Sequence, residues 1–326
     1  MIFVIGSGSF SGQDFVDLSL TLRKDVFGVN RSEKKDVFLK YKTNPNIKNF
    51  SQLTADLNKD MQSIFDAIDA TRPEVIVNFA AQSEVGPSWE HPEHWYQTNT
   101  VAHSRLVNFL RKKDFLKRYI HISSPEIYGT CVGTVYEDHP HNPSTPYAAS
   151  KSAADWINAV YHKQYGFPVI TVRSTNVYGP RQQLFKIIPK TILSIFANKK
   201  IPLHGGGNAV KSYIHIRDIS RGTFDILEYG NVGEIYHLSP NTGVSVKSVV
   251  RSICNNLEVK FEDFVEIVED RPGQDAAYVI DSSKVRNQTE WRPAILLQDG
   301  IKETIDWVDD NYNELKKYPF EYIHRL

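Results

Sequence analysis

Short apolar runs recur along the first half of the chain, at residues 2–5, 25–29, 75–79, 119–122 and 169–172. Each run is continuous rather than alternating, which is typical of strands buried on both faces of a parallel sheet. Between the runs the apolar residues take helical spacing; at 61–70, for example, they fall on one face. This alternation of strand and helix predicts an α/β fold with a doubly wound parallel sheet.

The second half of the chain is divided by prolines and glycines into shorter pieces from about residue 175 onward. Helical stretches are expected near 186–197, 218–229, 245–257 and 300–315. Short strands are expected near 201–204, 211–216, 235–238 and 265–269. The pattern predicts a first domain over 1–175 and a smaller, mixed α/β lobe over 176–326, with one segment of the lobe returning to the first sheet. The glycine triplet at 205–207 is expected to turn a β-hairpin, because no helix start follows it.

Composition and charge exclude several classes of protein. The 326 residues are 41% hydrophobic and 23% charged, which is ordinary for a soluble globular protein. The 38 basic residues balance the 38 acidic ones, so we expect neither a nucleic-acid-binding nor a membrane-binding surface. No apolar run is long enough to span a membrane, and residues 1–5 are too short for a signal peptide. The two cysteines, Cys131 and Cys254, favour a cytoplasmic location over a disulfide framework.

A glycine-rich segment at 6–12 (GSGSFSG) joins the first apolar run to a helical stretch. Such a turn lets backbone N–H groups and a helix N-terminus approach a pyrophosphate, as in Rossmann dinucleotide sites; a plain tight turn is the alternative. The second run ends in Asn30, Arg31 and Ser32, where sites for NAD usually carry an acid. Arg31 and Ser32 suit a 2′-phosphate, which favours NADP over NAD, unless Arg31 is simply a solvated surface residue.

Tyr147 and Lys151 lie four positions apart, so in a helix over 147–165 both side chains share one face. A neighbouring ammonium group favours the phenolate, and Lys151 is therefore expected to lower the pKa of Tyr147 toward neutrality. Helices also carry such a pair by chance, so its context matters. Ser124 follows the run at 119–122, and catalytic residues of open α/β sheets lie at the carboxyl ends of strands. We expect Ser124 to position a substrate hydroxyl that Tyr147 deprotonates.

The chain resembles the extended short-chain dehydrogenases, in particular the nucleotide-sugar 4,6-dehydratases of the dTDP-glucose and GDP-mannose types. The resemblance covers nearly the whole chain. Beyond the glycine segment and the Tyr147–Lys151 pair, it is carried by DL at 56–57, FAAQS at 79–83, TN at 98–99, SSPEIYG at 123–129, NVYGP at 176–180 and RPGQD at 271–275. Together these motifs are specific for the superfamily and less specific for the substrate.

The resemblance implies a role for each matching position. The residues that bind NAD(P) would be Gly6, Gly8, Phe10, Ser11, Gly12, Asn30, Arg31, Ser32, Asp56, Leu57, Phe79, Ala80, Ala81, Gln82, Asn99, Tyr147 and Lys151. The residues that bind the nucleotide sugar would be Ser83, Glu84, Ser124, Asn176, Lys186, Lys211 and Arg271, with a solvated lysine as the alternative for Lys186 and Lys211. The catalytic residues would be Ser124, Glu126, Tyr147 and Lys151. A homodimer is also implied, in which helices at 96–110 and 147–165 form a four-helix bundle.

Glu126 decides the class of reaction, unless it makes only a structural ion pair. Once C4 of a hexose is a ketone, the C5 proton becomes acidic, and a carboxylate beside it can remove that proton. The C6 hydroxyl then leaves as water, and hydride returns to C6 to give a 4-keto-6-deoxy sugar. The expected function is therefore 4,6-dehydration of an NDP-hexose. The alternatives are a nucleotide-sugar 4-epimerase, which needs no base at C5, a UDP-uronate decarboxylase, and a non-catalytic NAD(P)-binding regulator.

Three positions depart from the dTDP-glucose type. Pro125 stands where that type has an aspartic acid thought to protonate the leaving hydroxyl, so Glu126 or a water would have to supply the acid; the GDP-mannose type also lacks it. Ser9 replaces a glycine, and its Cβ is expected to crowd the phosphates. Lys211 replaces a phosphate-binding arginine and offers a point charge rather than a bidentate fork. These departures point to a variant branch with another nucleotide or another sugar.

His91 and His94 are close enough in the sequence for both to be metal ligands, but no metal site is expected from them. Pro92 lies between the two histidines and interrupts their spacing, and the sequence offers no apparent third ligand.

Overall fold

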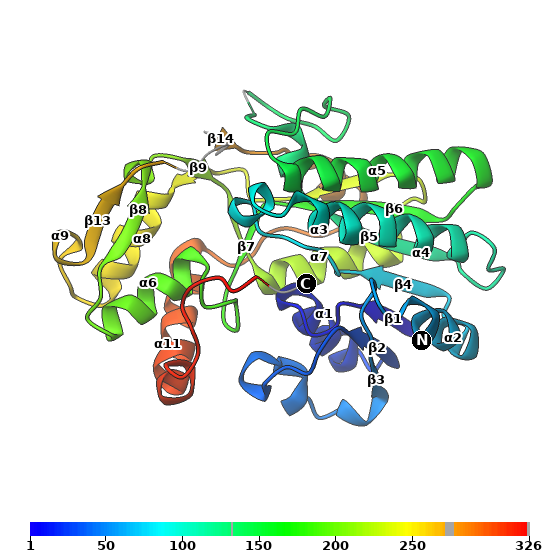
Figure 1. Cartoon of the computed structure of the whole chain (residues 1–326), viewed down its shortest axis with the longest axis horizontal. Coiled ribbons are helices and arrows are strands. Elements are labelled where there is room, and N and C mark those ends of the chain that lie inside the picture. Colours follow the sequence, from blue (N-terminus) through cyan, green and yellow to red (C-terminus); the bar gives the residue numbers. More distant parts are fainter. Residues whose placement is uncertain (132, 271–276, 325–326) are drawn as a thin grey trace.

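The computed structural model describes residues 1–131, 133–270 and 277–324, and its centre is a seven-stranded, entirely parallel sheet. In spatial order the strands are β11 (Ile235–Leu238), β6 (Val169–Ser174), β5 (Arg118–Ser123), β4 (Val75–Asn78), β1 (Ile2–Ile5), β2 (Val26–Asn30) and β3 (Phe50–Thr54). The doubly wound parallel sheet predicted from the apolar runs is confirmed. Figure 1 shows this sheet and its helices on the right and the smaller lobe on the left.

Each face of the sheet is covered by helices, which explains why the strands are continuously apolar. Ile2 and Val4 join the hydrophobic core that α1 (Phe10–Thr21) and α7 (Ile216–Tyr229) form on one face. Phe3 and Ile5 face the opposite core. The helical segments on that side are α2 (Met61–Thr71), α3 (Pro92–Tyr96), the π-helical η5 (Gln97–Ala102), α4 (His103–Leu110) and α5 (Pro146–Tyr165). Successive residues of β1 thus point into two different cores, and all four are buried.

The smaller lobe has its own hydrophobic core and several short sheets. Its helices are α6 (Ile187–Phe196), α8 (Val246–Asn256), α9 (Phe261–Phe264) and α11 (Leu297–Leu315). Its strand pairs are β7 (Asn176–Tyr178) with β10 (Tyr213–His215), β8 (Ile201–His204) with β13 (Val265–Val268), and β9 (Val210–Lys211) with β12 (Val244–Ser245) and β14 (Ala277–Tyr278). A further helix, α10 (Ser283–Gln288), packs beside β11, which lies in the large sheet although it comes from beyond residue 175.

Two local features differ from the sequence expectations. The edge strand β3 was not predicted. It has only one neighbouring strand among the described residues, and its exposed residues Ser51, Gln52 and Thr54 interrupt the apolar run. The expected hairpin at the glycine triplet is wrong. Gly205, Gly206 and Gly207 do turn the chain with positive φ angles, but β8 and β9 on either side pair with partners from later in the chain. Turn residues predict that the chain changes direction, but they do not determine which strands pair with each other.

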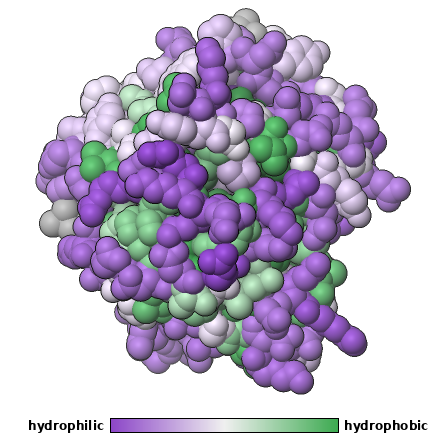
Figure 2. Space-filling model, turned by 90° about the vertical axis from the view of Figure 1, so that its right-hand side faces the viewer, coloured by the Kyte–Doolittle hydropathy of each residue, from purple (hydrophilic) through white to green (hydrophobic). Residues whose placement is uncertain are grey.

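No helix among the described residues is both long and apolar enough to cross a membrane. On the face shown in Figure 2, hydrophilic residues predominate and the hydrophobic ones form separate, small areas. Cys131 and Cys254 are both buried and are not joined by a disulfide.

A buried ion pair connects the helix α5 to the sheet. Arg173 on β6 is 1% exposed, and its Nε and Nη2 donate to Oδ2 of Asp155 on α5 at 3.0 and 2.9 Å. The Nη1 of Arg173 also donates to the hydroxyl of Tyr128, which lies 2.7 Å from Nε2 of His237 on β11. One guanidinium therefore holds the loop after β5, the strand β11 and the helix α5 in a fixed arrangement.

We expect Arg173→Met to lower the free energy of unfolding by about 3–5 kcal/mol, because the carboxylate of Asp155 would stay buried without its partner. Urea denaturation followed by circular dichroism measures the change. Glu74→Gln is the matched control, because the Glu74–Lys117 pair is exposed and such pairs contribute little to stability. A midpoint for Arg173→Met that moves no further than that of Glu74→Gln would contradict this account.

Candidate active site

A cavity of about 750 Å³ opens at the carboxyl ends of the parallel strands. Among its lining residues are fifteen of the positions expected to bind the cofactor: Gly6, Gly8, Phe10, Ser11, Asn30, Arg31, Ser32, Asp56, Leu57, Phe79, Ala80, Ala81, Gln82, Tyr147 and Lys151. The substrate and catalytic positions that line it are Ser83, Glu84, Ser124, Glu126, Asn176 and Lys186. Gly12, Asn99 and Lys211 are not among the lining residues, and Arg271 lies outside the described residues.

The glycine segment forms a cradle that side chains would fill. A Cβ on Gly8 would come within 2.2 Å of Nδ2 of Asn30, and one on Gly12 within 2.1 Å of the carbonyl oxygen of Gly6. Gly6 itself has a φ of +82°. Ser9 is the N-cap of α1, and its Oγ accepts a hydrogen bond from the N–H of Gly12 at 3.1 Å. The backbone and the start of α1 thus line the cavity closely, which fits a dinucleotide pyrophosphate.

The end of β2 is shaped by Asn30. Its Nδ2 donates to the carbonyl oxygen of Ser32 at 2.7 Å, and this bond bends the chain around Gly8. Beyond the bend, Arg31, Lys34 and Lys35 line the cavity, together with the carboxylate-bearing Glu33. This corner of the cavity therefore carries more positive than negative side chains.

Asn99 lies behind the cavity wall, in the π-helical segment η5. Its Oδ1 accepts from the N–H of Gln82 at 2.9 Å, and its Nδ2 donates to the carbonyl oxygen of Gln82 at the same distance. Nδ2 also donates to Oγ of Ser150 on α5 at 2.9 Å. Asn99 thus joins the loop after β4 to the helix α5 and holds the backbone of Gln82, which lines the cavity.

Ser124 and Glu126 are placed by a short 3-10 helix, η6 (Pro125–Tyr128), that follows β5. Ser124 is its N-cap: Oγ accepts from the N–H of Glu126 at 3.2 Å, and Pro125 occupies the first helical position, where no N–H is needed. Ser124 also hydrogen-bonds Tyr147 on α5. The serine hydroxyl therefore connects the tyrosine to the segment that carries the carboxylate.

The expected effect of Lys151 on Tyr147 is wrong for the protein without its cofactor. Burial raises the pKa of Tyr147, and the negative charge of Glu126 raises it further, while the bond with Ser124 lowers it. Nζ of Lys151 instead donates to the carbonyl oxygen of Ile122 at 2.7 Å. Burial lowers the pKa of Lys151 to about 8. Desolvation of both groups outweighs the attraction that the four-residue spacing suggested.

An ion pair crosses the substrate end of the cavity. Nζ of Lys186, the N-cap residue of α6, lies 2.7 Å from Oε1 of Glu84, whose side chain is 15% exposed. Oγ of Ser83 donates to the same carboxylate at 3.4 Å. Lys186 comes from the smaller lobe and Glu84 from the loop after β4, so this pair joins the two walls of the cavity. Asn176, at the start of β7, lies on the same cavity wall as Lys186.

Two parts of the cavity wall that the sequence motifs did not mark are notable, besides the lysines after β2. Arg181 lines it with a φ of +72°, and burial lowers its pKa. Its position directly after the 176–180 motif was the available signal. The second part is the C-terminal tail after α11, whose residues Tyr318, Pro319, Glu321, Tyr322 and Ile323 line the cavity. In Figure 1 the tail runs from α11 in the smaller lobe to the centre of the molecule. No motif in the sequence marks it.

Pro92 does not separate His91 from His94, contrary to the sequence expectation. Pro92 is the first residue of α3, His91 is its N-cap residue, and both imidazoles lie beside the carboxylate of Glu93. A helix start at this proline brings the two rings to the same side instead of separating them.

Comparisons with known proteins agree with this geometry. The family model described as GDP-mannose 4,6 dehydratase matches residues 3–304. A dTDP-glucose 4,6-dehydratase of Xanthomonas campestris is 34% identical over 72% of this chain and 72% of that protein. A dTDP-glucose 4,6-dehydratase of Haemophilus influenzae is 30% identical over 94% of this chain and 97% of that protein. Among solved structures, a dTDP-glucose 4,6-dehydratase of Streptomyces venezuelae with NAD and TYD bound superposes with a TM-score of 0.86 at 26% identity, covering 96% of this chain and 98% of that one.

Proposed function

The chain belongs to the nucleotide-sugar 4,6-dehydratase family of extended short-chain dehydrogenases, and on that premise we propose how its residues divide the reaction. The protein is an NAD(P)-dependent lyase that converts an NDP-hexose to its 4-keto-6-deoxy form. Tyr147, supported by Ser124 and Lys151, removes the proton of the C4 hydroxyl, and Glu126 carries out the elimination across C5–C6.

The observation that carries this assignment is the position of Glu126. Its carboxylate is close enough to Tyr147 to raise the pKa of the phenol, and both groups line the cavity that contains the glycine cradle. A base at C5 must lie within reach of the sugar whose C4 hydroxyl meets the tyrosine, since C4 and C5 are adjacent atoms. A 4-epimerase has no use for a carboxylate at this place, which favours dehydration.

The first step is removal of the C4 hydroxyl proton by Tyr147, with Ser124 holding the same hydroxyl. Bound NAD(P)⁺ supplies the chemistry of hydride acceptance from C4 and of hydride return to C6. The buried ammonium of Lys151 would stabilise the phenolate, together with the positive charge that bound NAD(P)⁺ would supply. The carbonyl of Ile122 orients that ammonium toward the strand end.

The second step is elimination of water, in which Glu126 acts as both base and acid. Its carboxylate takes the C5 proton, the C5–H electrons form the C5–C6 double bond, and the C6–O bond breaks. Pro125 has no proton to give, so the proton now on Glu126 passes to the leaving hydroxyl and water departs. Return of hydride to C6 would then be completed by uptake of a solvent proton at C5. The 3-10 helix that begins at Pro125 fixes Glu126 on this path.

The proposed cofactor is NADP rather than NAD. The end of β2 carries Asn30 in place of an acid, and Arg31, Lys34 and Lys35 line the adjoining part of the cavity. Guanidinium and ammonium groups bind a 2′-phosphate through charge-assisted hydrogen bonds, whereas a ribose diol calls for a carboxylate.

The proposed assembly is a homodimer formed through α5 and the helical segment α3–η5–α4. Apolar side chains on the outer side of these helices support it: Trp156 is 60% exposed, Val160 53% and Val101 45%. Trp156 and Val160 are four residues apart on one face of α5. A face of this kind is covered when two copies pack in a bundle.

The function is tested by incubating the protein with a panel of nucleotide hexoses in heavy water and recording product masses. Dehydration predicts that the product has lost one water and has gained one solvent deuterium at C5. A mass-neutral product would indicate an epimerase, and loss of carbon dioxide a decarboxylase. No turnover with any sugar would favour the regulator. The nucleotide hexose that reacts also identifies the nucleotide base.

Glu126→Gln should still reduce the bound cofactor from substrate and release no dehydrated product. The neutral amide also removes a negative charge that raises the pKa of Tyr147. Because the phenolate then forms more easily, cofactor reduction should reach half its maximal rate at a lower pH than in the unmodified protein. Absorbance of the reduced nicotinamide in single turnovers measures both effects, and Tyr147→Phe is the control that removes the reduction. Normal dehydration by Glu126→Gln would overturn the assignment.

NADP⁺ should bind more tightly than NAD⁺, and Arg31→Ala should weaken NADP⁺ binding roughly 10- to 100-fold while NAD⁺ binding changes little. Dissociation constants from calorimetry decide this. Lys48→Ala, an exposed lysine outside the cavity, is the control. Tighter binding of NAD⁺ by the unmodified protein contradicts the preference.

Trp156→Glu should convert a dimer into a monomer in size-exclusion chromatography with light scattering, because a charge on the contact face opposes its burial. Ile267→Glu, at an equally exposed apolar residue of β13, should leave the dimer intact. A monomeric unmodified protein would disprove the assembly.

A further inference from the structure

The C-terminal tail closes one side of the cavity and is held there by contacts with both lobes. Nζ of Lys190 on α6 lies 2.7 Å from Oε1 of Glu321, and the ring of Tyr322 packs edge-on against Phe185. Further along, the ring of His324 stacks on the buried Trp95 of α3 with centroids 5.3 Å apart. The last described residue of the tail thus reaches the start of α3, on the opposite lobe.

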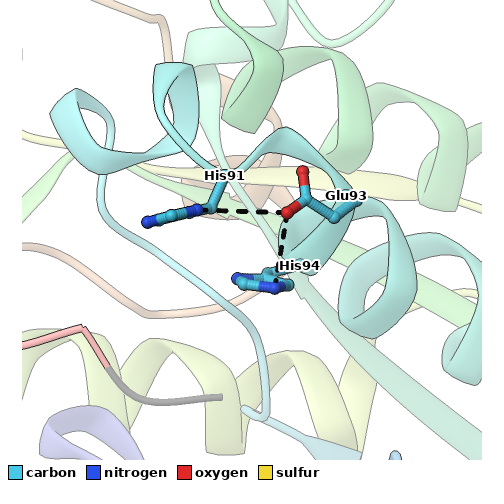
Figure 3. A group of neighbouring side chains, drawn as sticks. All are labelled: His91, Glu93 and His94. Carbon is cyan, nitrogen blue, oxygen red and sulfur yellow. Dashed lines mark ion pairs between the residues drawn. The ribbon is translucent and has the colours of Figure 1, made fainter.

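Three potential metal ligands converge at that same place. Oε1 of Glu93 lies 3.4 Å from Nε2 of His94 and 4.0 Å from Nδ1 of His91, and the three ligand atoms all lie within 4.8 Å of one another. Figure 3 shows both imidazoles directed at one oxygen of the carboxylate. The side chains are 46%, 66% and 23% exposed for His91, Glu93 and His94, so an ion can reach them from solvent.

The other ring nitrogen of His94 contacts the tail. Nδ1 of His94 lies 2.8 Å from Nε2 of His324, and the two rings are stacked with centroids 5.0 Å apart. Nδ1 of His324 in turn lies 3.1 Å from the hydroxyl of Tyr322, which lines the cavity. A hydrogen-bonded chain therefore runs from the three-ligand cluster through His94 and His324 to the cavity wall.

We propose that His91, Glu93 and His94 bind a divalent transition metal ion of the zinc class, and that the bound ion fastens the C-terminal tail over the cavity through His94 and His324. Two imidazole nitrogens and one carboxylate oxygen form a recognised zinc ligand set, with water completing the coordination. Magnesium and calcium prefer all-oxygen sites, so they are excluded by the two histidines.

The geometry needs only small side-chain movements to hold the ion. Bonds of about 2.0–2.2 Å to zinc put neighbouring ligand atoms about 3.3 Å apart in a tetrahedral site. The Glu93–His94 distance of 3.4 Å is already close to that value. The longer distance, 4.0 Å, involves His91, whose half-exposed ring stacks on His94 and His324 and would have to shift toward the carboxylate. Pro92 fixes the helix start that brings the ligands together.

The coupling to the tail follows from the two nitrogens of His94. An imidazole that ligates a metal through Nε2 carries its proton on Nδ1, and the metal makes that N–H a stronger donor. Nε2 of His324 is the acceptor within reach. Metal binding therefore strengthens the contact that holds the tail, and release of the metal weakens it.

Calorimetric titration of the tag-free, chelator-treated full chain with zinc chloride tests the site. We expect saturable binding of one equivalent per chain, and a loss of affinity of at least tenfold in His91→Ala and in His94→Ala. His139→Ala, an exposed histidine outside the cluster, is the matched control and should bind zinc like the unmodified protein. The site would be overturned if the unmodified protein showed no saturable zinc binding. It would also be overturned if His91→Ala and His94→Ala bound zinc as tightly as the unmodified protein.

Hydrogen–deuterium exchange of the peptide that covers residues 316–324 tests the coupling. Zinc should slow exchange in the unmodified protein. His324→Ala should still bind zinc, within about 100-fold of the original affinity, and should lose the zinc-dependent slowing. Zinc binding at the three ligands without any change in tail exchange would refute the fastening of the tail.

Discussion

The buried guanidinium of Arg173 is the constraint on which the arrangement of the active site depends. It lies on β6, at the centre of the group formed by α5, β11 and the loop after β5. The catalytic tyrosine and lysine are on α5, and the carboxylate is two residues before Tyr128 in that loop. A charge this deeply buried tolerates no other arrangement of its partners, because any displaced partner would leave an unpaired charge in a medium of low dielectric constant. The cost of separating this one ion pair thus fixes the relative positions of Tyr147, Lys151 and Glu126, although none of them contacts the pair.

Around this fixed centre the cavity is completed by parts with weaker attachments. The glycine cradle connects β1 to α1, and the strand ends belong to the large sheet. The opposite wall depends on the ion pair between Glu84 and Lys186 and on the tail, whose contacts are partly exposed. On the expected role of Lys186 in substrate binding, a nucleotide sugar would compete for this lysine with the carboxylate of Glu84. Binding at this end would then exchange one ion pair for another.

Patterns along the chain were enough to predict the parallel sheet and the glycine turn after β1, because each depends on local spacing. The catalytic set came from the family resemblance of several motifs together and stays a prediction. Buried strands produce continuous apolar runs, and the turn after β1 needs its glycines whatever the rest of the chain does. The edge strand β3 and the partners of β8 and β9 were missed because they depend on what packs nearby in space. The same limit explains Tyr147: spacing places Lys151 on its face of the helix, but the pKa of the phenol depends on burial and on Glu126, 21 positions earlier in the sequence. Arg181 and the tail were not predicted as parts of the site, because they line the cavity only through the way the chain folds in space.

The tail also has a consequence for the order in which the protein matures during synthesis. The cradle around Gly8 leaves the ribosome early, and the residues near Tyr318 leave it some 310 positions later. At roughly 5–20 residues per second, about 15 to 60 seconds separate the two events. The sheet is complete only when β11 has emerged, and from then until the tail emerges one side of the cavity stays open to water. A nascent chain therefore has an interval in which its dinucleotide pocket is formed but not yet enclosed by the tail.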